Sequence, residues 1–382
     1  MRYPVVSLLR TGRPSVKTGL RRLYLVLGVA STFLLAACAL PMSAFAGWAL
    51  TNLSFVDASH GWATGESADP SSFAVLKTVD SGASWTVQKS SGAFNGTGLD
   101  VQFVDRSRGI WVNSYVYLTT DGGAHWKPLN FPGSWGGGTF VDFASPTSVW
   151  IAGTYGSDGT GRCVARSTTG GRRWQTCLSQ GTAPGGSPSS LSAPSSSTAY
   201  IWSRGLMVTR NGGVTWSRVK TGYPMKKNAW WTIDFPALKT GWAVRSGGSS
   251  MLRTTDGGKH WVKQVPAPGL QLNDMDFISK RTGWVVGAAG AVFGTVDGGA
   301  SWRDFSIPNS GDLISVDFTD ALHGWVATAG AWGESNSIYR TVDGGLHWEQ
   351  ASENPTKWRV TRPPTGSSPD GFPGLRLRHI AM

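Results

Sequence analysis

The chain has 382 residues, and its 51 Gly and 20 Trp argue against a helical protein, because Gly is unfavourable inside helices and aromatic residues favour strands. With 40% hydrophobic and 11% aromatic residues it can bury a core, which excludes an intrinsically disordered chain. The formal net charge is +12, but residues 1–37 hold six basic groups and no acidic one, so the rest carries 12 − 6 = +6 and requires no nucleic-acid partner.

The N-terminal segment has the character of an export signal. Arg21 and Arg22 precede an apolar run from Leu23 to Ala37, as in a secretory signal peptide. Residues 1–37 are therefore expected to be a signal peptide or membrane-targeting segment, followed by a short linker over residues 38–47.

Three fates of this segment stay open. Leu35-Ala36-Ala37-Cys38 resembles the lipobox of bacterial lipoproteins, which would make Cys38 the lipidated first residue of the mature chain. Ala44-Phe45-Ala46 is an alternative cleavage site that would release a soluble protein. Leu23–Leu40 also approaches the length of an uncleaved membrane anchor. Each fate predicts an exported protein, on the outer face of a bacterial membrane or in a periplasmic or extracellular space.

A repeated box dominates the rest of the sequence. The pattern Ser/Thr-x-Asp-x-Gly-x-x-Trp occurs seven times, and its Trp residues recur at intervals of 41 to 48 residues. Five copies are intact, whereas Thr169 and Asn211 replace the Asp in the other two. Asp and Gly suit a tight turn between antiparallel strands, and the Trp can anchor that turn by burying its ring.

A second element precedes each box. It is an apolar strand ending in Phe, followed seven or eight residues later by an aromatic residue, usually after Gly. The copies are Phe55/Trp62, Phe103/Trp111, Phe143/Trp150, Ala193/Tyr200, Phe235/Trp242, Phe277/Trp284 and Phe318/Trp325. Each repeat of about 43 residues therefore predicts four short strands, which is the unit of a β-propeller blade. We expect an all-β, seven-bladed β-propeller of four-stranded blades over residues 48–350.

These motifs resemble known families. The boxes are similar to the Asp-boxes, or BNR repeats, of sialidases, xyloglucanases and sortilin-type receptors. Their combination with Phe-x-Asp and Gly-Trp, as at Phe55-Val56-Asp57 and Gly61-Trp62, resembles the photosystem II stability/assembly factor family. That resemblance implies a seven-bladed propeller that assists assembly of a photosynthetic membrane complex.

The remaining segments carry less information. Residues 351–382 have no box and are expected to be a disordered basic tail. Cys163 and Cys177 flank one predicted hairpin, and an oxidising compartment would allow them to form a disulfide. No metal site or cofactor is expected, because two Cys without nearby His cannot complete a tetrahedral zinc site.

The titratable residues argue against an enzyme. Five of the six histidines occupy repeat positions, which is the pattern of fold residues rather than catalytic ones. Nine carboxylates show the same tendency, since five lie in boxes and four precede the Phe of the first strand. The resemblance to sialidases would imply an arginine triad, a Tyr nucleophile and an N-terminal Arg-Ile-Pro-like motif, and no such motif occurs in this sequence. We therefore expect no catalytic residues.

Two sets of residues are candidates for binding. Blades one, three and seven carry insertions between their second and third strands, which should lie on the face opposite the boxes and present Glu66, Tyr155, Trp332 and Glu334. Basic residues also precede four of the boxes, namely Lys77, Arg166, Arg253 and Arg340, and could form a partial positive ring.

These observations predict a non-catalytic, exported propeller that binds a membrane or envelope protein complex and assists its assembly or stabilisation. A tether through Cys38, a monomeric state and the absence of nucleic-acid binding are also expected. The alternative function is a glycan-binding or glycan-cleaving propeller of the sialidase or xyloglucanase type.

Overall fold

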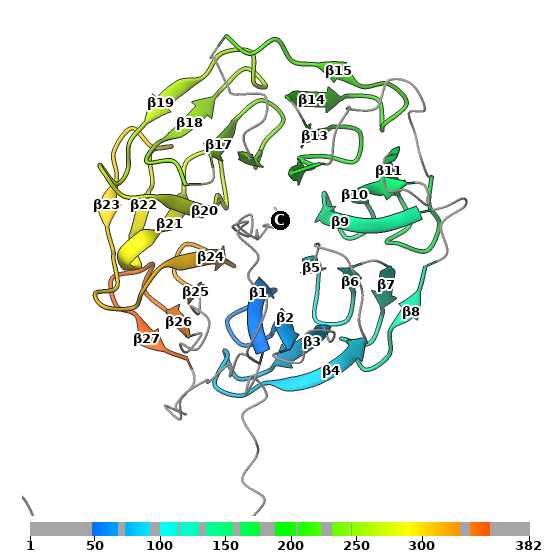
Figure 1. Cartoon of the computed structure of the whole chain (residues 1–382), viewed down its shortest axis with the longest axis horizontal. Coiled ribbons are helices and arrows are strands. Elements are labelled where there is room, and N and C mark those ends of the chain that lie inside the picture. The colour runs from blue at the N-terminus through cyan, green and yellow to red at the C-terminus, as the bar shows by residue number, and fades with distance from the viewer. Residues whose placement is uncertain are drawn as a thin grey trace, which may run out of the picture. The chain divides into compact units, whose positions relative to one another are not determined.

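The computed structural model describes residues 48–67, 73–91, 100–113, 115–129, 135–155, 161–175, 188–203, 205–222, 231–245, 247–328 and 337–351. They form seven antiparallel sheets arranged as the blades of a propeller, which confirms the expected all-β fold (Figure 1). In this part of the chain the only helical element is η1 (Ala288–Gly290), and no helix is long and apolar enough to cross a membrane. The expected signal, the linker, Cys38 and residues 352–382 lie outside the described residues.

The strands of each blade follow one another in chain order, and the first strand lies nearest the centre of the ring (Figure 1). The innermost strands are β1 (Trp48–Phe55), β5 (Asp100–Phe103), β9 (Trp135–Phe143), β12 (Ser190–Ser192), β16 (Trp231–Asp234), β20 (Leu272–Asp276) and β24 (Leu313–Phe318). The second strands are β2 (Gly61–Ser67), β6 (Gly109–Val112), β10 (Val149–Tyr155), β13 (Ala199–Trp202), β17 (Gly241–Arg245), β21 (Gly283–Gly287) and β25 (Gly324–Thr328).

The outer half of each blade follows the same order. The third strands are β3 (Phe73–Thr78), β7 (Val116–Thr119), β11 (Gly161–Ser167), β14 (Leu206–Thr209), β18 (Met251–Thr254), β22 (Val292–Thr295) and β26 (Ile338–Thr341). The outermost strands are β4 (Thr86–Ser91), β8 (Lys127–Pro128), β15 (Ser217–Arg218), β19 (Val262–Gln264), β23 (Arg303–Asp304) and β27 (Glu349–Gln350).

The third blade departs from this plan. Its described sheet has three strands, and a single bridge between Arg166 and Gln175 stands where the outermost strand pairs in the other blades. Cys163 on β11 is buried and disulfide-bonded. Because Cys177 lies outside the described residues, the Cys163–Cys177 pairing stays a prediction.

Aromatic stacking joins neighbouring blades. The aromatic residue near the start of a second strand stacks on the Phe at the end of the next blade's innermost strand, with ring centroids 3.5–3.8 Å apart. The described stacks are Trp62–Phe103, Tyr200–Phe235, Trp242–Phe277, Trp284–Phe318 and Trp325–Phe55. The recurrent aromatic pairs of the sequence therefore form the core between blades, where they bury large apolar surfaces.

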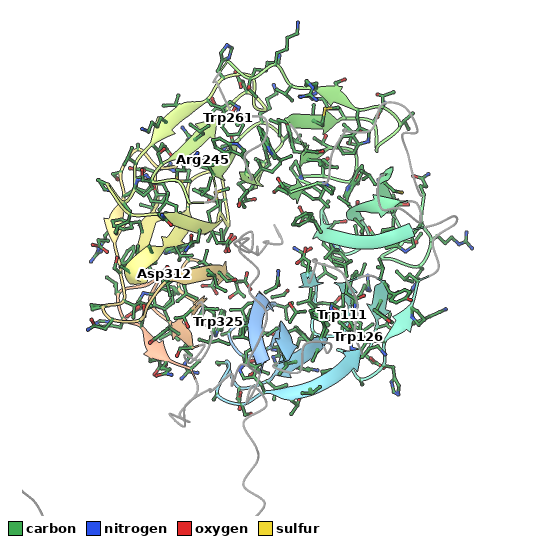
Figure 2. The ribbon with its side chains drawn as sticks, viewed as in Figure 1. Trp111, Trp126, Arg245, Trp261, Asp312 and Trp325 are labelled. Carbon is green, nitrogen blue, oxygen red and sulfur yellow. The ribbon has the colours of Figure 1, made fainter. Side chains whose placement is uncertain are left out.

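The expected Phe103/Trp111 pair is wrong by one residue. Phe103 pairs across the strands with Gly109, so Ile110 occupies the position that Trp62 holds in the first blade. Ile110 packs toward the third blade, whereas Trp111 points to the opposite face of β6 and clusters with Trp62 and Phe103. Trp111 and the box residue Trp126 lie close together in this blade (Figure 2), with centroids 6.2 Å apart.

The ring closes by side-chain contacts between the first and seventh blades. The Phe55 ring stacks on Trp325, and the Phe55 amide donates a hydrogen bond to Asp317 Oδ2 at 2.6 Å. The Trp325 indole N–H donates to the Ser81 carbonyl at 3.1 Å, and Trp325 is seen beside the first blade in Figure 2. In the described residues β1 to β4 form one sheet and β24 to β27 another, so these two blades share no strand.

The glycine of the second strand has a steric role that can be tested at Gly241. A Cβ on Gly241 would overlap the Phe235 ring, which lies over it. We expect Gly241→Ala to lower the free energy of unfolding by about 1–3 kcal/mol, as measured by denaturant titration. In a Phe235→Ala background the same substitution should lower the free energy of unfolding much less, because the overlapping ring is gone. The fourth blade has this combination naturally, with Ala193 and Ala199 at the two corresponding positions. An equal cost in both backgrounds would contradict this explanation.

Candidate functional site

The polar residues of the boxes hold the turns together, as the fifth blade illustrates. The Thr254 hydroxyl donates to Asp256 Oδ1 at 2.9 Å and accepts the Gly258 amide at 2.9 Å. Asp256 Oδ1 also accepts the His260 amide at 3.0 Å, and the Trp261 indole N–H donates to the Gly258 carbonyl at 2.8 Å. The carboxylate, the hydroxyl and the indole thus all satisfy groups of their own turn.

The two degenerate boxes form the same turn. Thr169 Oγ1 accepts the Arg173 amide at 2.8 Å, and Asn211 Oδ1 accepts the Thr215 amide at 3.0 Å. Any side-chain oxygen at this position can therefore serve as the acceptor. Only the charge differs, because the third and fourth blades lack the carboxylate.

The five histidines in the described part of the chain are fold residues, as the sequence predicts. His125, His260 and His347 contact the carboxylate of their own box through Nδ1 at 2.6–2.7 Å. His60 and His323 contact Asp57 and Asp320 in the turn between the first two strands. Hydrogen bonds from the His347 amide and ring hold the pKa of Asp343 at about 2, so this carboxylate is not poised as a general base.

The two kinds of turn lie on one face of the propeller. In every blade an amide of the box donates to a carbonyl of the turn between the first and second strands. The pairs are Ser81–Ser59, Gly122–Ser107, Gly170–Thr147, Gly212–Ser197, Gly257–Lys239, Gly298–Arg281 and Gly344–Leu322. We call the surface formed by these paired turns the box-turn face.

Exposed apolar side chains gather on the box-turn face. Seven of the eleven exposed large hydrophobic residues in the described part of the chain belong to it: Val79, Val214, Leu238, Val296, Leu322, Val342 and Leu346. Because so many exposed apolar residues lie on the same face, this face is a candidate interaction surface.

The charges of the box-turn face are also unevenly distributed. The turns of the seventh and first blades carry Asp57, Asp80, Asp320 and Asp343, with no Lys or Arg. The turns of the third to sixth blades carry Arg172, Arg173, Arg210, Lys239, Lys259, Lys280 and Arg281 against only Asp256 and Asp297. The face therefore has an acidic and a basic side, which favours an oriented partner.

Inner-strand side chains link each blade to the next. The residue before each Phe position accepts the backbone amide of the Phe position in the following blade, at 2.6–3.0 Å. In ring order the acceptors are Ser54, Gln102, Asp142, Ser192, Asp234, Asp276 and Asp317, and the donors are Phe103, Phe143, Ala193, Phe235, Phe277, Phe318 and Phe55. The carboxylates that precede Phe in the sequence are thus structural links.

These links place several carboxylates close together. Burial raises the pKa of Asp317 to about 7, although its bond from the Phe55 amide opposes the shift. Burial, and then the charges of Asp317, Asp234 and Asp274, raise the pKa of Asp276 well above its ordinary value. Even so, no group of His, Cys, Asp or Glu in the described residues is arranged to hold a metal ion.

The four basic residues that precede boxes do not lie on an open surface, and Lys77, Arg166 and Arg253 lie between blades. Lys77, Arg166 and Arg253 place their charged groups 5.3–5.7 Å from the ring centroids of Trp62, Trp150 and Trp242. The Arg340 Nε donates to Glu349 Oε1 at 2.6 Å. All four are half-buried, and burial lowers the pKa of Arg166. Lys77, Arg166 and Arg253 thus make cation–π contacts within the fold, whereas Arg340 forms an ion pair.

The insertion residues are described only in part. Glu66 lies in β2 and Tyr155 ends β10, at the ends of these strands opposite the box-turn face. Trp332 and Glu334 lie outside the described residues, so a site formed by the insertions stays a prediction.

No protein-family model matches this chain, and no curated protein matches it significantly. Among solved structures it is similar to YCF48 bound to a D1 peptide, at 19% identity and a TM-score of 0.55, covering 74% of this chain and 90% of that one. YCF48 from Cyanidioschyzon merolae is 21% identical with a TM-score of 0.51, covering 67% and 84% of the two chains.

A third similar structure is the virginiamycin B lyase of Staphylococcus aureus with quinupristin, at 13% identity and a TM-score of 0.53, covering 74% and 93% of the two chains. The likeness of this chain to YCF48 confirms the expected resemblance to photosystem II assembly-factor propellers in fold. Since the lyase is an enzyme, the fold alone does not separate binding from catalysis.

The buried carboxylates predict a specific pH dependence. The folded state keeps the proton of Asp317 up to about pH 7, whereas the unfolded chain releases it near the ordinary pKa of 3.8. The free energy of unfolding should therefore fall as the pH rises from about 4 to 7. We expect a lower Tm at pH 8 than at pH 5. Asp317→Asn keeps an acceptor for the Phe55 amide without the charge and should flatten this slope; an unchanged slope would contradict the assignment.

The basic residues between blades should affect stability more than exposed ones do. Arg253→Glu places a carboxylate against the Trp242 ring and should lower the free energy of unfolding by about 1–3 kcal/mol. Arg253→Met keeps the apolar stem and should cost less. Lys259→Glu, at an exposed box position, is the control and should change stability by about 0.5 kcal/mol or less. Equal thermal shifts for Arg253→Glu and Lys259→Glu would refute the inter-blade packing.

Proposed function

We propose that this chain is an exported propeller that binds a protein component of a membrane or envelope complex and assists its assembly or stabilisation without catalysis. The observation that carries the proposal is the box-turn face, where exposed apolar residues and separated acidic and basic turns occur together. Interfaces commonly combine an apolar contact with charges that orient the partner. The similarly folded YCF48 offers a precedent, since it binds a peptide of the D1 protein.

The chemistry of the described residues supports binding over catalysis. Five histidines and all five box carboxylates are engaged in their own turns, which leaves them no role as free acids, bases or nucleophiles. A glycan-binding or glycan-cleaving propeller is the alternative that the experiment below must separate.

The disulfide-bonded state of Cys163 supports export, because disulfides persist mainly in oxidising compartments outside the cytoplasm. The basic and apolar character of residues 1–37 supports the same location, and lipidation of Cys38 would tether the propeller to a membrane. In this proposal the tether holds the box-turn face within reach of a membrane-bound partner.

The proposal is tested by crosslinking the tagged full chain in intact cells, solubilising the membranes and identifying the captured proteins. We expect one membrane or envelope complex to be recovered. Val296→Asp and Val342→Asp, at positions 72% and 60% exposed on the box-turn face, should reduce its recovery. Val262→Asp is the matched control, because Val262 is 68% exposed but lies on the outermost strand β19 and not in a turn.

Other outcomes would overturn the proposal. Recovery of cell-wall or glycan material in place of a protein complex would favour the carbohydrate alternative. Equal capture by the three valine variants, each with an unchanged Tm, would remove the box-turn face as the binding surface.

A further inference from the structure

A small cavity lies on the box-turn face, where β9, β12 and β16 of the third to fifth blades end. The space in it that a water-sized group can occupy is about 20 Å³. Ala144, Pro194 and Pro236, which follow these strands, form apolar parts of its wall, together with Phe235 and Phe277. A cavity of this size has room for the compact end group of one amino-acid side chain rather than for a larger ligand.

The cavity wall also carries two carboxylates, Asp142 and Asp234. Asp142 Oδ2 accepts the Ala193 amide at 2.6 Å, and Asp234 Oδ2 accepts the Phe277 amide at 3.0 Å. These backbone bonds hold both carboxylates in place before any ligand arrives. Asp142 Oδ1 also accepts the Gln102 side-chain amide at 3.5 Å. A carboxylate has about four acceptor sites, so an ammonium group can be added to the partners that each carboxylate already has.

The surroundings of the cavity favour a cation. The seven innermost strands contain six aspartates and no Lys, Arg or His. Repulsion among these carboxylates contributes to the raised pKa of Asp276, and Asp234 is one of the charges responsible. A positive group entering the cavity would relieve this repulsion, whereas an anionic group would increase it.

The repeat is broken at this place. Ala193 stands where six blades have Phe, and it lines the cavity beside Ser192. An aliphatic stem ending in a compact positive charge matches the apolar wall and the two carboxylates together.

We propose that this cavity binds a lysine side chain of the protein partner, with its methylene stem between Pro194 and Pro236 and its ammonium group at Asp142 and Asp234. The inference rests on the proposed function, because it assumes a protein partner on the box-turn face. It adds the chemical identity of one residue that the partner presents.

The test uses the full chain and two capped tripeptides, acetyl-Gly-Lys-Gly-amide and its norleucine counterpart, which has the same stem without the ammonium group. Binding is followed by NMR titration at low ionic strength. We expect the lysine peptide to bind at least about tenfold more tightly. Equal binding of the two peptides would overturn the proposal, and this comparison needs no protein variant.

Three charge-removing variants locate the site. Asp142→Asn and Asp234→Asn keep an acceptor for the backbone amide and should each weaken lysine-peptide binding by about threefold to tenfold. Asp100→Asn is the matched control: Asp100 also accepts a backbone amide, that of Val141 at 2.9 Å, but it does not line the cavity. Equal weakening by all three variants would show a general charge effect and reject the cavity as the site.

Two outcomes would assign the cavity to another occupant. If spermidine binds at Asp142 and Asp234 but the lysine peptide does not, the ligand is a free polyamine and the lysine proposal fails. If the lysine peptide binds only after Lys357, Arg359 and Arg362 are replaced by Gln, the C-terminal segment of the chain is the occupant and the partner is not.

The two proposals can fail separately. If the two peptides bind equally but a membrane complex is still captured, only the lysine site is rejected. If the lysine peptide binds more tightly but no protein is captured, the proposed function is rejected, and with it the assignment of the lysine to a partner.

Discussion

The structure depends on one hydrogen bond repeated around the ring, from the backbone amide at the end of each innermost strand to a side chain of the preceding blade. An innermost strand is the edge of its sheet, so its outward amides have no neighbouring strand. A buried amide without an acceptor would cost free energy, and the Ser, Gln and Asp side chains supply one. The same bond sets the Phe position, so that the Phe can stack on the Trp or Tyr of the preceding blade.

This solution concentrates negative charge in the middle of the propeller. Four of the seven acceptors are aspartates, and Asp100 and Asp274 serve neighbouring amides in the same way. Burial and mutual repulsion oppose their ionisation, which explains the raised pKa values of Asp276 and Asp317. The linkage that closes the ring is therefore sensitive to pH, and the carboxylates of the innermost strands favour cations over anions.

In each box, the residues that hold the turn differ from the residues that are exposed on the surface. The Thr, Asp and Trp side chains of a box hold the turn together through hydrogen bonds, while the variable positions between them are mostly exposed. In the third and fourth blades Thr169 and Asn211 keep the turn without the carboxylate, which makes that side of the box-turn face more basic at no structural loss. Variation that the fold tolerates thus gives the surface its acidic and basic sides and its exposed aliphatic residues.

The fold was predictable because its signals are local. A box is a complete turn within eight residues, and the spacing of boxes gives the blade, so the seven-bladed ring and the structural role of the histidines follow from the sequence. The same local reasoning explains why Gly precedes the stacked aromatic residue, as at Gly241.

Other features required the tertiary structure. Alternate residues of a strand face opposite sides, so the choice between Ile110 and Trp111 depends on pairing with Phe103, which spacing alone does not decide. Ring closure joins Phe55 to Asp317 across 262 residues. The linking acceptors differ in residue type and so form no motif. Likewise, an arginine such as Arg253 is normally expected at the surface. Its charge lies between blades, on the Trp242 ring, only because the next blade packs against it.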